Sequence, residues 1–205
     1  MDAASQPFVP AAPEPILRQV AVRGLSIALG AALTPSAEVD VDAVIRRCTD
    51  VRPLDELPVT REWTLRHGVH LLVDDGAAMR PLASDVGQVV EAFRDAVGGR
   101  EGADGPLRVT RFRGTPPDCA SSAFLERGPT RVLLSDLGIG ASPGAAPVED
   151  WVHWLDAARR RGLRLLALVP YRPARWPGPI ARKVRCVHWD PSSTASRVSA
   201  RVRSW

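Results

Sequence analysis

The stretch that decides the fold is His67-Gly-Val-His-Leu-Leu-Val-Asp-Asp-Gly-Ala-Ala-Met79, an apolar run that stops at two aspartates and a glycine. Its apolar residues are nearly continuous, which is typical of a strand covered on both faces within a parallel sheet. Ligand sites in such sheets lie just beyond the carboxyl ends of the strands. Asp74 and Asp75 stand at that position, so the sequence predicts a site there.

Other strands are predicted on either side of this one. Thr130-Arg-Val-Leu-Leu-Ser-Asp136 has the same form, an apolar run that ends in an acid before a glycine-bearing turn. Strict alternation over 107–113 predicts an edge or near-edge strand, a buried strand is predicted at 163–169, and a final short strand is predicted at 184–189. Residues 59–65 alternate as in a half-exposed strand, which we expect to form a hairpin with the central strand through the turn at 66–68.

Helices are predicted between these strands. Three- and four-residue spacing of apolar side chains favours helices over 82–97 and 148–161. Weaker patterns of the same kind permit helices over 16–33 and 40–48. A basic helix is expected over 193–205. The alternation of strands and helices predicts an α/β protein, a three-layer, doubly wound, mostly parallel sheet of Rossmann-like type. We expect a flexible lead-in over 1–15, a helical extension packed on the core over 16–58, and the α/β domain over 59–205.

Composition narrows the classes of function. The chain has 205 residues, 45% of them apolar, which is enough for one substantial core. The net charge of +4 comes almost wholly from arginine, since Lys183 is the only lysine. This bias is typical of a GC-rich genome, so a basic surface for nucleic acid is not inferred from it.

Localisation and cysteine chemistry also follow from the sequence. No basic segment precedes an apolar one at the N-terminus and no run is long enough to span a bilayer, so a cytoplasmic protein is expected. Cys48, Cys119 and Cys186 are widely separated and lack metal-ligand spacing. Neither a zinc site nor a disulfide framework is predicted.

Two motifs at the predicted strand ends resemble those of von Willebrand factor A domains. That family begins with a strand ending in Asp-x-Ser-x-Ser-Met and ends a later strand in Ser/Thr-Asp-Gly. Val73-Asp-Asp-Gly-Ala-Ala-Met79 fits the first frame, and Leu133-Leu-Ser-Asp-Leu-Gly138 fits the second with one inserted residue. The resemblance covers about 59–190 and implies the same fold.

A narrower resemblance is to the A-like domain at the N-terminus of large actinobacterial proteins, which often occur near AAA+ ATPases or in conflict and signalling systems. There the aspartate turn follows a strand with a tryptophan, here Trp63, and a late Arg-Arg-Gly leads into a strand and proline, here Arg160 to Pro170. This resemblance implies a protein partner, with an AAA+ ATPase as one candidate.

The metal-ion-dependent adhesion site of the family is degenerate in this chain. The resemblance implies that Asp74 and Asp136 hold Mg²⁺ or Mn²⁺, with weaker contributions from Asp75 and Thr115. The family's two serines, which supply hydroxyl ligands, are replaced by Gly76 and Ala78. The alternative is that the two acids only cap their own turns. No other cofactor is expected.

The leading hypothesis is a non-catalytic, intracellular protein-interaction domain, a scaffold or adaptor. Its contact candidates are Asp74, Asp75, Thr115 and Asp136 on the loops, together with Trp176 as an exposed aromatic residue. Two alternatives stay open. A metal-dependent phosphoryl-transfer enzyme would use the acids, although neither an Asp-x-Asp motif nor a nucleophile elbow is present. A nucleic-acid-binding module would use the arginines, although these are dispersed among acids.

Overall fold

The computed structural model describes residues 19–98, 105–117, 130–140, 144–191 and 193–203. The strands are β1 (Ala32–Val39), β2 (Val59–Thr64), β3 (Val69–Asp74), β4 (Leu107–Phe112), β5 (Thr130–Leu134), β6 (Leu165–Val169) and β7 (Arg185–His188). The helices are α1 (Gln19–Gly30), α2 (Val41–Thr49), α3 (Ala83–Ala96), α5 (Val148–Arg160), α6 (Gly178–Ala181) and α7 (Ala195–Arg203), with the short 3₁₀ helices η1 (Ala77–Leu82) and η2 (Pro173–Arg175).

The main sheet is five-stranded and parallel throughout, in the order β4-β3-β5-β6-β7. The predicted α/β, Rossmann-like architecture is therefore confirmed, and β4 is an edge strand as its alternation predicted. If the five strands of this sheet are numbered from 1, starting at β3, their order is 2-1-3-4-5. This is a doubly wound arrangement with its switch point between β3 and β5. All residues of β3 are buried, as expected for a strand covered on both faces.

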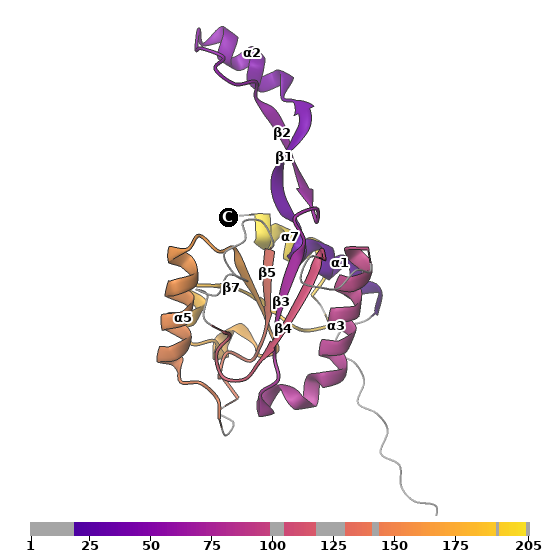
Figure 1. Cartoon of the computed structure of the whole chain (residues 1–205), viewed down its shortest axis with the longest axis vertical. Helices are drawn as coiled ribbons and strands as arrows, with labels where there is room; N and C mark the ends of the chain where they lie inside the picture. Colours follow the sequence, from indigo (N-terminus) through magenta and orange to yellow (C-terminus); the bar gives the residue numbers. More distant parts are fainter. Residues whose placement is uncertain (1–18, 99–104, 118–129, 141–143, 192, 204–205) are drawn as a thin grey trace, which may run out of the picture.

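Helices cover both faces of the sheet, which gives three layers (Figure 1). Along β3, β5 and β6 the side chains alternate between the two faces. Leu71, Val132 and Leu166 face the cluster that contains the buried residues of α1, α3 and α7, while Leu133 and Ala167 face the cluster that contains those of α5 and α6. Trp151 and Trp154 of α5 are both buried in the second cluster.

The expected hairpin between 59–65 and the central strand is wrong. β2 pairs antiparallel with β1, with Leu33 opposite Trp63 and Val39 opposite Val59. Helix α1 ends at Gly30, where an added Cβ would lie 2.8 Å from Val69 Cγ2, so the chain leaves the core at a tight crossing. Leu33, expected in a helix, consequently lies in a strand.

Of the extension predicted over 16–58, the described residues 19–58 are helical only in part. Helix α1 packs on α3 and α7, but β1 follows it, and α2 has no buried residue. Residues 32–67, here called the arm, form a two-stranded ribbon with α2 at the end away from the sheet (Figure 1). Asp40 caps α2, because its carboxylate accepts a hydrogen bond from the Ala43 amide at 2.8 Å. Among the described residues, no helix combines the length and apolar character needed to cross a membrane.

Candidate functional site: the carboxyl edge at the switch point

A small open cleft of about 160 Å³ lies at the carboxyl ends of β3 and β5. The chain leaves β3 towards α3 on one face of the sheet and leaves β5 towards α5 on the other, so the two turns separate and leave space between them. The cleft is lined by Asp74, Asp75, Gly76, Ala77, Ala78, Arg80, Arg113, Gly114, Asp136, Gly138 and residues 144–146. The structure thus brings together the two strand-end acids that the sequence singled out.

Asp74 is held by one donor at each oxygen. Its Oδ1 accepts a hydrogen bond from the Gly76 amide at 2.7 Å, and its Oδ2 accepts one from the Ser135 hydroxyl at 2.7 Å. Ser135 Oγ in turn accepts the Leu137 amide at 2.9 Å. Because Ser135 follows β5, this chain of bonds ties the two turns together across the switch point.

Asp136 organises the second turn in the same manner. Its Oδ1 accepts the Gly138 amide at 3.1 Å and its Oδ2 accepts the Gly140 amide at 2.8 Å. Leu137 and Gly138 both have left-handed backbone conformations, with φ of 55° and 73°. For Leu137 this conformation is sterically costly, and its fully buried side chain helps to hold it in place.

The electrostatic environment of Asp74 acts on its ionisation. Burial raises the pKa of its carboxyl group, and the negative charges of Asp136 and Asp75 act in the same direction. The hydrogen bonds from Ser135 and Gly76 oppose burial by stabilising the ionised form. The ionised state of Asp74 therefore depends on these two donors.

The remaining predicted site residues lie around the cleft or away from it. Asp75 is directed towards β4, where its Oδ1 accepts a hydrogen bond from Arg111 at 2.8 Å. Thr115 is half-buried on the loop after β4, but Arg113 and Gly114 are the residues of that loop that line the cleft.

Trp176, proposed from the sequence as an exposed aromatic contact, is only partly exposed in the structure. This side chain is half-buried and packs against the core cluster on the α5 face of the sheet. Its indole N–H donates to the Tyr171 carbonyl at 2.7 Å, so the polar edge of the ring is satisfied within its own loop.

These residues supply only some of the ligands that a divalent cation needs. Asp74 and Asp136 offer two carboxylates, but each of the four oxygens already accepts a hydrogen bond. Space is also short beside Ala78, because a Cβ added at Gly140 would lie 2.6 Å from its methyl carbon. Within the described part of the chain, no group of three or more His, Cys, Asp or Glu side chains is placed to hold a metal ion. Magnesium would need most of its six oxygens from water or from a partner.

Sequence reasoning missed three residues of the site. Ser135 precedes the acid of the second motif, and its position beside Asp74 became visible only when β3 and β5 were paired. Arg80 and Arg113 are exposed at the cleft; Arg113 is the last residue of the strand predicted over 107–113, and Arg80 lies in η1, between the predicted central strand and the helix that follows it. With 27 basic residues in the chain, the sequence offered no signal that singled these two out.

Comparison with protein-family models, curated proteins and solved structures finds no match to this chain.

Proposed function

We propose that this chain is a non-catalytic protein-interaction domain of von Willebrand A type whose contact face is the carboxyl edge of the sheet at the β3–β5 switch point. The observation that carries the proposal is the use of the acids: every carboxylate oxygen of Asp74 and Asp136 accepts a hydrogen bond from its own turn or from the neighbouring one. Side chains used in this way shape and stiffen two loops.

The same arrangement argues against the phosphoryl-transfer alternative. A carboxylate nucleophile or general base needs a lone pair directed at the substrate and space for the reacting group. Here Asp74 is 5% exposed and Asp136 is 4% exposed, and the cleft between them is small. The acids are more suitable as supports of the surface than as groups that react.

The rim of the cleft supplies the groups for a partner to contact. Arg80 and Arg113 are exposed at its mouth, and Asp75 is held by Arg111 beside them. Exposed guanidinium groups over rigid loops suit a carboxylate-bearing segment of a partner protein. An AAA+ ATPase encoded in the same system is the candidate that the sequence resemblance supplies.

A divalent-metal titration tests the metal prediction directly. Wild type and an Asp74→Asn, Asp136→Asn double variant would be titrated with MgCl₂ and MnCl₂ by calorimetry, since asparagine keeps the shape of each side chain while removing its charge. Saturable binding that the double variant loses would assign a cation to this edge. Equal heats of titration in the two proteins would mean that the two acids bind no cation. Partner binding at this edge would then be independent of metal.

Site-specific photo-crosslinking in the native host tests the contact face. A photoreactive residue would replace Ala77, an exposed alanine of the cleft, or Ala181, an exposed alanine that precedes β7 at the opposite edge of the sheet. We expect a discrete protein adduct from position 77 and none from 181. Equal capture at both positions would contradict the assignment, and so would hydrolysis of p-nitrophenyl phosphate that requires Asp74.

A further inference from the structure

The arm (32–67) has no core of its own. None of its 36 residues is buried, in contrast to the strands and helices of the α/β domain. A two-stranded ribbon is only marginally stable in water unless it packs against further structure. An ordered arm of this length therefore calls for a surface that covers it.

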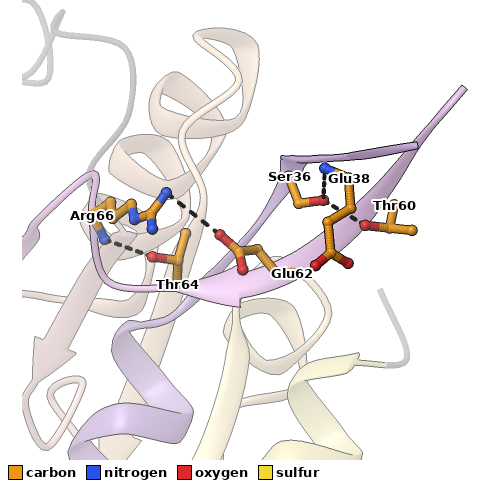
Figure 2. A network of polar contacts seen from close by, with 6 residues as sticks. All are labelled: Ser36, Glu38, Thr60, Glu62, Thr64 and Arg66. Atoms are coloured by element: carbon orange, nitrogen blue, oxygen red, sulfur yellow. Dashed lines mark hydrogen bonds and ion pairs between the residues drawn. The ribbon is translucent and has the colours of Figure 1, made fainter. Parts of the chain in front are cut away.

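The ribbon of the arm is amphipathic. Figure 2 shows the polar face, where Ser36 and Thr60 share a hydrogen bond, Arg66 pairs with Glu62 at 3.6 Å, and the Arg66 amide donates to the Thr64 hydroxyl at 3.1 Å. Opposed residues of an antiparallel pair lie on the same face. The other face carries the pairs Leu33 with Trp63, Pro35 with Arg61, and Val39 with Val59.

Exposed apolar side chains concentrate on this arm. Nine large apolar residues are exposed in the described part of the chain, and eight of them belong to the arm: Leu33, Val39, Val41, Ile45, Val51, Leu54, Leu57 and Val59. In α2, Val41 and Ile45 are four residues apart and therefore lie on one side of the helix, 60% and 56% exposed. Exposed apolar side chains gathered on one segment in this way point to an interaction surface.

A mainly apolar groove lies at the base of the arm. It has a volume of about 270 Å³ and is lined by Gly24, Ile27, Ala28, Ala31, Trp63, Ala195 and Ser199, which come from α1, the residue that follows it, β2 and α7. Ile27, 44% exposed, is the ninth exposed apolar residue and is the one that lies outside the arm. The chain thus presents an apolar helix at the tip of the arm and an apolar groove at its base.

We propose that two copies of this chain associate by exchanging arms, with α2 of each copy seated in the groove between α1, α7 and Trp63 of the other. A ribbon of eight residues separates tip and groove within one copy by roughly 25 Å, so α2 cannot reach its own groove along a straight arm. When two arms lie antiparallel about a two-fold axis, each tip lies over the base of the other arm. The interface is then self-complementary, as closed dimers require.

The size of the arm fits this occupant. A stable interface of standard size uses about 20 to 30 residues on each side. The 36 residues of the arm together with the groove reach that class, and a two-fold arrangement covers both exposed surfaces with a single contact. The contact is distant in the fold from the cleft at the carboxyl edge and does not depend on its function.

Sedimentation equilibrium of the full chain over a concentration series tests the association. We expect a dimer for wild type and a dissociation constant raised about tenfold or more by Ile45→Glu, because the charge would enter an apolar contact. Arg46→Gln on the same helix is the matched control, since it changes the net charge by the same amount and should leave the dimer intact. A monomeric wild type, including one that binds a different protein through the arm, would overturn the proposal.

Disulfide trapping tests the docking of tip in groove. Cys48 is an exposed residue of α2, and Ser199 lines the groove. Bonded cysteines require Cα atoms within about 7 Å, which the straight arm excludes within one copy. Mild oxidation of Ser199→Cys should yield a covalent dimer, and the Cys48→Ser, Ser199→Cys double variant should not. A dimer whose trapping does not need Cys48, or no trapped dimer, would refute this docking.

Discussion

The hydrogen bond from Ser135 to Asp74 is the contact most open to a quantitative test. Ser135 is completely buried, and its hydroxyl donates to Asp74 Oδ2 while accepting the Leu137 amide. Replacement by alanine removes both bonds and leaves a small void. We therefore expect Ser135→Ala to destabilise the protein by acting on the two turns of the candidate site.

The expected loss of stability follows from the two groups that lose their hydrogen bond to Ser135, the Asp74 carboxylate and the Leu137 amide. A hydrogen bond to a charged group contributes about 1.5–3 kcal/mol, and an unsatisfied buried amide costs about 1–3 kcal/mol. Partial relaxation reduces their sum, so the free energy of unfolding should fall by about 3 kcal/mol near neutral pH.

The loss should depend on pH in a defined direction. The Ser135 bond lowers the pKa of Asp74 by stabilising its ionised form, against the effect of burial. Without this bond the folded-state pKa rises further, so the full cost of the substitution is present only above the raised pKa of Asp74 in the variant. The difference between the two proteins should therefore shrink as the pH falls from the raised Asp74 pKa of the variant to the lower pKa of the wild type.

Urea denaturation of both proteins at a series of pH values measures this difference, with Ser26→Ala as the matched control. Ser26 is also a buried serine, but its hydroxyl donates to the Val22 carbonyl of its own helix at 2.9 Å and not to a charged group of the described residues. Its replacement should change stability by less than about 1 kcal/mol at every pH. An equal cost for the two substitutions, or a pH-independent cost for Ser135→Ala, would refute the reasoning.

Three further predictions concern the core and the thiols. Burial, with the charges of neighbouring arginines, lowers the pKa of His70 from 6.5 to about 4. The free energy of unfolding should therefore fall by about 3 kcal/mol as the pH drops from about 6.5 to about 4. His70→Gln should remove most of this pH dependence, as measured by acid titration followed by circular dichroism. Gly140→Ala would place a Cβ 2.6 Å from the methyl carbon of Ala78 and should lower the free energy of unfolding by about 1–3 kcal/mol. Gly87 lies in α3 with open space around it, so Gly87→Ala should raise the free energy of unfolding by about 0.5–1 kcal/mol. Thermal unfolding of the two variants measures both changes, and the reverse order of stability would contradict the packing. Burial raises the pKa of Cys186 to about 12, so maleimide should leave Cys186 unlabelled in the native protein and label it after unfolding in urea, as read by peptide mass spectrometry.

The sequence by itself determined the repeating elements of the α/β domain. Continuous apolar runs identified β3, β5 and β6, and helical spacing identified α3 and α5, because these patterns express burial on one or both faces over a few residues. The same runs located both acids at strand ends. Parallel pairing then required these acids to meet at one edge of the sheet.

Only the tertiary structure decided which segments pair and what each side chain contacts. β2 pairs with β1 and not with β3, and this choice, which creates the arm, depends on residues that the helix α2 separates in sequence. Ser135 reaches Asp74 across 61 positions, and Asp75 at the rim of the cleft accepts a hydrogen bond from Arg111 of the neighbouring strand. Local periodicity reports how a residue is buried, but it carries no information on its partner, because contacts between distant segments are set by how whole elements pack.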